Sequence, residues 1–182
     1  MKCPVCKDTA LEIQDVAGSL VAGVCGNCKG KWISVQSYHF WLESVGPEEV
    51  QIDSASNESI ETSENAKLCQ TCERILTRFK ISFDSSLFID RCSFCLGIWL
   101  DQADWVYLNQ CDLIRDLDKI ATESWQQKVH KDELKSAVLL VYQNKFGKQK
   151  FDKVREFKKW VFEQDGREEI LSFLRDTNPL HM

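Results

Sequence analysis

The chain has 182 residues, of which 43% are hydrophobic and 28% are charged, and its formal net charge is −5. This composition is ordinary for a soluble protein. No apolar run approaches the roughly 20 residues of a membrane-spanning helix, and no secretion signal is visible at the start of the sequence. A protein this acidic has no general attraction for phosphate backbones, so contact with nucleic acid would need a local basic patch.

Cysteines carry the strongest signal, because eight of the nine form four Cys-x-x-Cys pairs arranged as two sets. The pairs of a set are separated by 18 residues in the first and by 19 in the second. This spacing is typical of structural zinc sites, in which four thiolates saturate one tetrahedral ion. The predicted ligands are Cys3, Cys6, Cys25 and Cys28 at the first site and Cys69, Cys72, Cys92 and Cys95 at the second.

The same cysteines indicate a cofactor and a location. We expect two zinc ions per chain, with iron bound as in rubredoxin as the alternative, since the two metals share this ligand geometry. Disulfides fit less well, because the spacing and the lack of a signal favour a reducing compartment. The expected location is therefore the cytoplasm.

Each cysteine set is expected to form a zinc ribbon, which is a short β-hairpin closed at its open end by metal. In residues 1–42, strand-like runs at 11–14 and 20–24 flank a turn, and a helix is expected at 34–42. A third, very short strand is expected at Trp32 and Ile33.

Residues 67–111 repeat this pattern, with strands expected at 76–83 and 87–90 and a helix at 102–109 capped by Asp101. Both copies place a glycine and then a tryptophan after the last cysteine, at Gly30 and Trp32 and at Gly97 and Trp99. We expect the glycines to take positive φ values, and the tryptophans to pack over the hairpins rather than to stack on a ligand.

The segment between the ribbons, residues 43–66, contains seven acidic residues and no basic one. Such a segment buries too little apolar surface to offset the entropy of its chain, so we expect a solvated linker.

Residues 112–182 lack metal ligands, and their apolar residues recur at helical spacing. Breaks are expected at Gly147 and Asp165-Gly166, which gives three or four helices in a small bundle. The predicted fold class is therefore α+β, with two zinc ribbons followed by an all-α C-terminal domain.

Few other residues suggest chemistry. His39 is expected to be a surface or partly packed residue rather than a ligand, and Cys111 a small buried residue at a helix end or, alternatively, a reactive thiol. No catalytic motif and no small-molecule site is evident, so an enzyme is not indicated.

A basic patch at residues 145–160 interleaves cations with phenylalanine and tryptophan, which is a pattern that can bind single-stranded nucleic acid. A solvated helix face over an apolar core is the preferred interpretation, because Phe151, Val154, Phe157 and Val161 have core spacing. The candidate nucleic-acid contacts are Lys145, Lys148, Lys150, Lys153, Arg155, Lys158 and Lys159.

The cysteine motifs resemble a bacterial and archaeal zinc-finger family that is itself similar to the zinc ribbon of general transcription factor IIB. That family has Cys-Pro-x-Cys, a hairpin, then Cys-x-x-Cys-Gly-Gly-x-Trp-Leu-Asp and a short helix. The second copy matches from Cys92 to Asp101, with Leu96 at the first glycine, whereas the first copy has Lys29 there and Ile33-Ser34 for Leu-Asp. The resemblance implies a zinc-ribbon fold and says little about activity.

Taken together, these features predict a non-catalytic zinc-binding protein with a regulatory or interaction role. Its ribbons would be structural, and its ribbon surfaces and helical region would bind a protein partner. The alternatives are a transcription-related regulator that binds nucleic acid through the basic patch, and a redox or metal-handling protein. No membrane association is expected.

Overall fold

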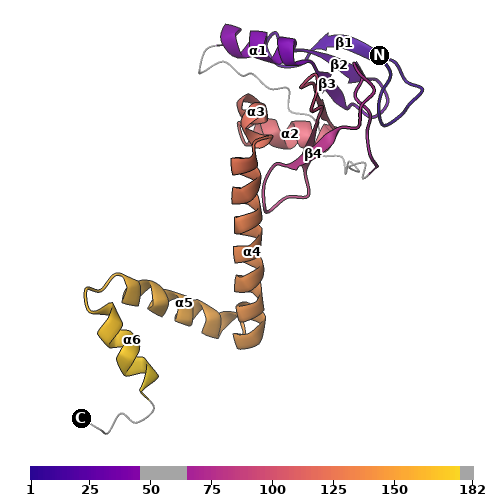
Figure 1. The fold of residues 1–182 in the computed structure, drawn as a ribbon. Coiled ribbons are helices and arrows are strands. Elements are labelled where there is room, and N and C mark those ends of the chain that lie inside the picture. Colours follow the sequence, from indigo (N-terminus) through magenta and orange to yellow (C-terminus); the bar gives the residue numbers. More distant parts are fainter. Residues whose placement is uncertain (46–64, 177–182) are drawn as a thin grey trace. The chain divides into compact units, whose positions relative to one another are not determined.

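The computed structural model describes residues 1–45 and 65–176, and the predicted linker therefore lies almost wholly outside the described residues. The chain divides into two compact units, Met1–Asp132 and Glu133–Met182 (Figure 1). Residues 112–132, which we had assigned to the helical domain, thus belong with the ribbons. No helix in the described ranges is both long and apolar enough to cross a membrane.

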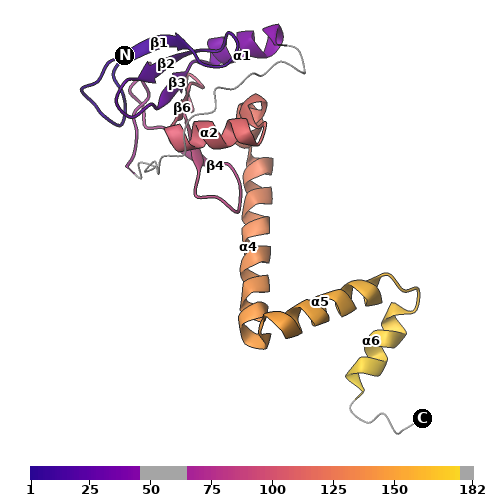
Figure 2. The same ribbon diagram turned by 180° about the vertical axis from the view of Figure 1, so that it is seen from behind.

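The first unit is built on one antiparallel sheet of six strands, in the order β1-β2-β3-β6-β5-β4. Each ribbon supplies three strands, and the two ribbons meet where β3 pairs with β6 (Figure 2). The strands are β1 (Leu11–Asp15), β2 (Val21–Cys25), β3 (Lys31–Ile33), β4 (Thr77–Lys80), β5 (Phe88–Arg91) and β6 (Ile98–Leu100).

Each ribbon ends in a helix that starts directly after its third strand. The first, α1 (Val35–Ser44), begins at Ser34, whose Oγ accepts a 3.1 Å hydrogen bond from the Ser37 N–H, as an N-cap does. The second, α2 (Gln102–Gln110), begins at the predicted cap Asp101. The polypeptide then forms a 3₁₀ turn, η1 (Ile114–Asp116), and a short helix, α3 (Leu117–Ile120).

One apolar core holds these helices and both ribbons together. Tyr38 and Trp41 of α1, Leu108 of α2 and Ile114 of η1 are all buried in it. The Tyr38 hydroxyl donates to the carbonyl of Ile114 at 3.0 Å and accepts from the Leu117 N–H at 3.1 Å. The ribbons are therefore joined both by a shared sheet and by a shared core.

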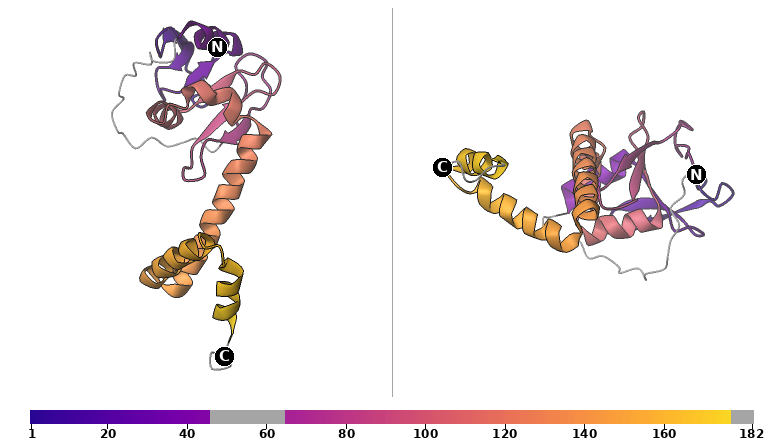
Figure 3. Two further views of the ribbon diagram at one scale, coloured as in Figure 1. Left: turned by 90° about the vertical axis from the view of Figure 1, so that its left-hand side faces the viewer. Right: turned by 90° about the horizontal axis from the view of Figure 1, so that it is seen from below.

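The second unit contains only helices among its described elements: the C-terminal part of α4 (Glu123–Phe146), then α5 (Lys148–Phe162) and α6 (Arg167–Arg175) (Figure 3). The breaks fall where they were predicted, and Gly147 takes a positive φ of 79°. A small bundle was expected here. Among the described residues of this unit only Val161 is buried, and most of the large apolar side chains are exposed.

Candidate metal centres

The eight predicted ligands come together as two groups of four, and in each group all sulfur atoms lie within 4.8 Å of one another. In the first group Cys3 Sγ is 3.6 Å from Cys28 Sγ, and Cys25 Sγ is 3.9 Å from Cys6 Sγ. A tetrahedral ion with Zn–S bonds of about 2.3 Å places its sulfurs about 3.8 Å apart. The first group therefore fits a four-coordinate ion.

The second group has the same arrangement with slightly shorter separations. Cys69 Sγ is 3.3 Å from Cys95 Sγ, and Cys72 Sγ is 3.4 Å from Cys92 Sγ. In both groups the first cysteine of each pair is buried and the second is half-buried. Four protein sulfurs complete a tetrahedral shell, so neither centre leaves a coordination position for water or substrate.

The same backbone turn builds all four cysteine pairs. The carbonyl of the first cysteine accepts a hydrogen bond from the N–H four residues later, for example 2.9 Å from Lys7 to Cys3 and 3.1 Å from Leu96 to Cys92. The residue that donates has a φ between 58° and 60° in every copy: Lys7, Lys29, Glu73 and Leu96. In each turn, backbone N–H groups point at a cysteine sulfur. For example, the N–H of Cys6 donates to Cys3 Sγ at 3.3 Å.

The prediction of positive φ at Gly30 and Gly97 was wrong. The left-handed residue is the one before each glycine, Lys29 or Leu96, which is where the resembled family has its first glycine. What the two glycines provide is space. A Cβ on Gly30 would lie 2.2 Å from Cζ2 of Trp99, and a Cβ on Gly97 would lie 2.4 Å from Cζ2 of Trp32.

The two tryptophans are buried, with 2% of Trp32 and none of Trp99 exposed, as the packing interpretation expects. Each indole lies on the glycine of the other ribbon. Both belong to one buried cluster that also holds Cys3, Cys25, Cys69 and Cys92. The metal centres therefore share their apolar cover.

The surroundings of the sulfurs favour thiolates at two of the ligands. Burial raises the pKa of the Cys25 thiol, but N–H groups of Cys28 and Asn27 and neighbouring thiols outweigh it and bring the pKa to about 7. At Cys92 the same balance, with N–H groups of Cys95 and Phe94, gives a pKa of about 6. Burial raises the pKa of Cys3 to about 11. Metal binding must therefore displace a proton from Cys3.

A buried polar cluster beside the second centre was not foreseen from the sequence. Lys67 is buried, with 3% of the residue exposed. Its ammonium lies 2.5 Å from the Asp90 carboxylate and 2.8 Å from the Asp101 carboxylate. The other oxygen of Asp101 accepts 2.7 Å from the Trp99 indole N–H. Asp101 thus positions the tryptophan, in addition to its place at the start of α2.

The remaining candidates are separate from the metal centres. His39 is half exposed and lies 2.8 Å from Asp118, whose other oxygen lies 2.7 Å from Arg91, so it links α1 to β5 as a surface residue. Cys111, expected to be buried at a helix end, is exposed and forms the C-cap of α2. All seven cations of the basic patch are exposed, six of them on α5 and Lys145 near the end of α4.

Comparison with protein-family models, with curated proteins and with solved structures found no match to this chain. The resemblance to the family similar to the transcription factor IIB ribbon therefore rests on the cysteine motifs themselves. What is established is a mixed α and β protein with two four-sulfur groups, each able to hold a metal ion.

Proposed function

We propose that this protein is a non-catalytic, zinc-stabilised interaction protein whose helical region binds a protein partner. The observation that carries the proposal is the contrast between its two units. The first unit buries both tryptophans and surrounds each metal position with four sulfurs, whereas the second leaves most of its large apolar side chains exposed.

A structural role for the metal is supported by the composition of the centres. Zinc is the metal that four thiolates in tetrahedral geometry suit best, with iron as the alternative. The cysteines form part of a buried apolar cluster, so the ion would hold together a region with little other core.

A partner for the second unit is supported by the apolar residues of α4. Val138, Leu140 and Val141 are 53%, 56% and 64% exposed, and Leu139 lies between them. Successive residues of a helix point about 100° apart, so these four surround the helix axis. A helix that is apolar all round is normally buried, and exposed apolar surface on this scale is typical of an interaction site.

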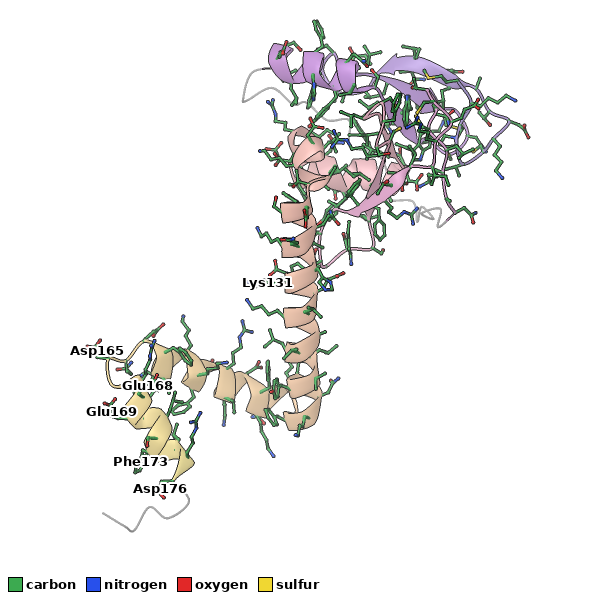
Figure 4. All side chains as sticks on the ribbon, in the orientation of Figure 1. Lys131, Asp165, Glu168, Glu169, Phe173 and Asp176 are labelled. Atoms are coloured by element: carbon green, nitrogen blue, oxygen red, sulfur yellow. The ribbon has the colours of Figure 1, made fainter. Side chains whose placement is uncertain are left out.

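The same character extends along the other two helices. On α5, the rings of Phe157 and Trp160 are stacked with centroids 5.6 Å apart and are about half exposed. On α6, Phe173 projects away from the helix and is 61% exposed (Figure 4). These side chains extend the proposed docking surface beyond α4.

The test is affinity capture with the zinc-loaded full chain, treated with nuclease, comparing three forms. Val141→Glu places a charge in the apolar segment, and Ser136→Glu adds the same charge to an exposed polar position of the same helix. We expect one protein to be recovered with the wild-type chain and with Ser136→Glu and to be lost with Val141→Glu. Equal recovery with all three chains, or none with any, would contradict the proposal.

A second candidate function, nucleic-acid binding, is supported by the exposure of the seven cations and of Phe157 and Trp160. Its test is a binding titration with single-stranded and duplex DNA and RNA at two salt concentrations, comparing wild type with Lys153→Ser/Lys158→Ser. Binding through phosphate contacts weakens steeply with salt and falls in the double variant. No retention at low salt would remove this candidate.

A further inference from the structure

Each ribbon supplies the tryptophan that covers a cysteine turn of the other ribbon. Trp32 comes from the first ribbon, yet its indole lies on Gly97, which closes the last cysteine turn of the second. Trp99 comes from the second ribbon and lies in the same way on Gly30 of the first. The two tryptophans are direct partners in the pairing of β3 with β6.

Each of these contacts is close to metal ligands. The carbonyl of Gly30 accepts a 2.9 Å hydrogen bond from the N–H of Cys25, and the carbonyl of Gly97 accepts one of the same length from the N–H of Cys92. The turns that hold the buried ligands Cys25 and Cys92 are therefore the turns on which the opposite tryptophans rest. The four half-buried ligands, Cys6, Cys28, Cys72 and Cys95, pack against the same cluster.

This arrangement makes the order of one centre depend on the other. If the second ribbon loses its metal and opens, Trp99 leaves Gly30, and the turn of Cys25 and Cys28 loses its apolar cover. The pairing of β3 with β6 is weakened at the same time. If binding an ion at one centre requires both ribbons to be ordered, the ion binds more tightly when the other ribbon is already ordered.

We infer that the two centres bind metal cooperatively, with Trp32 and Trp99 as the positioning residues that carry the coupling. The inference rests on the proposed structural role of zinc and adds regulation to it. Chains with two ions or none are favoured over chains with one, so chelation at one centre weakens ion binding at the other and destabilises the first unit. The expected coupling is a change in affinity of about 10- to 100-fold, which is ordinary for linked sites.

The first experiment is a competition titration of the full chain with Co²⁺ and with Zn²⁺, read by thiolate–cobalt absorption and by metal analysis. We expect wild type to bind two ions with a Hill coefficient above 1. Cys72→Ser removes a ligand of the second centre, and its intact first centre should bind one ion at least tenfold more weakly. Cys6→Ser should do the same to the second centre. Unchanged affinity at the intact centres would overturn the inference.

The second experiment separates the tryptophan contact from a general loss of folding. Gly30→Ala must displace Trp99, while Gly26→Ala, in the same turn, meets no atom within 4 Å and is the matched control. We expect Gly30→Ala to weaken the second centre about tenfold although no ligand of that centre has changed, and Gly26→Ala to leave it within about twofold.

A cycle then assigns the effect to coupling. In the Cys6→Ser background the first ribbon is already open, so Gly30→Ala should change the affinity of the second centre by less than about twofold. The inference fails if the glycine substitution has the same effect with and without the first centre. Two tight but independent ions would remove the coupling and leave structural zinc intact, whereas a chain that binds no metal would remove the proposed function itself.

Discussion

The carboxylate of Asp101 accepts the indole N–H of Trp99 at 2.7 Å, and through its second oxygen it lies 2.8 Å from the ammonium of Lys67. The tryptophan that covers the first metal centre is therefore held by a residue at the start of α2 and, through it, by a lysine just before the second centre. Lys67 also lies 2.5 Å from Asp90, so one buried cation is shared by two buried carboxylates.

Replacing Lys67 with methionine should destabilise the protein by about 3–5 kcal/mol, because it leaves the buried Asp101 carboxylate without its cation and Asp90 with Arg78 alone. The measurement is urea unfolding of the zinc-loaded chain. The control is Lys119→Met, since Lys119 is largely exposed and its pairing with Asp116 is that of a surface ion pair, worth at most about 1 kcal/mol. Equal losses in the two variants would contradict this reading of the cluster.

Removing metal with a chelator should unfold the first unit, because the ligands are part of its buried core. Trp32, Trp41 and Trp99 are almost fully buried, so their fluorescence should shift towards the red as water reaches them. The same titration followed by metal analysis shows whether ion loss and the shift coincide. A metal-free chain with the fluorescence of the loaded one would mean that the sulfur groups do not stabilise the fold.

Tyr38→Phe should cost about 1–3 kcal/mol, because the hydroxyl satisfies the buried carbonyl of Ile114 and the N–H of Leu117. The loss should appear as a lower urea midpoint with an unchanged slope. Tyr142 is 47% exposed and supplies the control, since Tyr142→Phe should change stability by less than about 0.5 kcal/mol. A Tyr38→Phe chain as stable as wild type would show that the link between α1 and η1 is unimportant.

The sequence was sufficient for the local structure of each ribbon. Cysteine spacing identified both four-sulfur groups, because a metal centre fixes which residue types occur and how far apart they lie. Ser34 and Asp101 marked the starts of α1 and α2. These features depend on residues close in the chain.

What the sequence did not reveal depends on residues far apart. β3 and β6 are only three residues long, which is too short for hydrophobic periodicity to indicate that they pair. The sequence therefore did not predict that the two ribbons share one sheet. Only the fold brings Lys67 to Asp90 and Asp101, which lie 23 and 34 positions away in the sequence. Both copies have a glycine at this position, which suggested that the backbone needs a positive φ there. The structure gives another reason for the glycine: the tryptophan of the other ribbon lies against it.

Asp104 is 2% exposed, and its carboxylate accepts hydrogen bonds of 3.1 Å from the N–H groups of Phe88 and Asp101. Burial raises its pKa from 3.8 to about 7, assisted by the charge of Asp101 and opposed by the two N–H groups. The folded chain therefore holds a proton that the unfolded chain has already lost. The stability that this carboxyl contributes is present at pH values below about 4 and is lost as the pH rises through 7.

The measurement is the free energy of unfolding of zinc-loaded wild type and Asp104→Asn between pH 5 and pH 8. The asparagine cannot titrate and loses one acceptor, so the variant should be less stable at pH 5. That difference should shrink with rising pH by at most about 1.4 kcal/mol per pH unit, because only the wild type takes up a proton on folding in this range. Metal release at low pH affects both chains alike and cancels in the difference. Parallel curves would show that Asp104 is already ionised at pH 5, with the two N–H groups outweighing its burial.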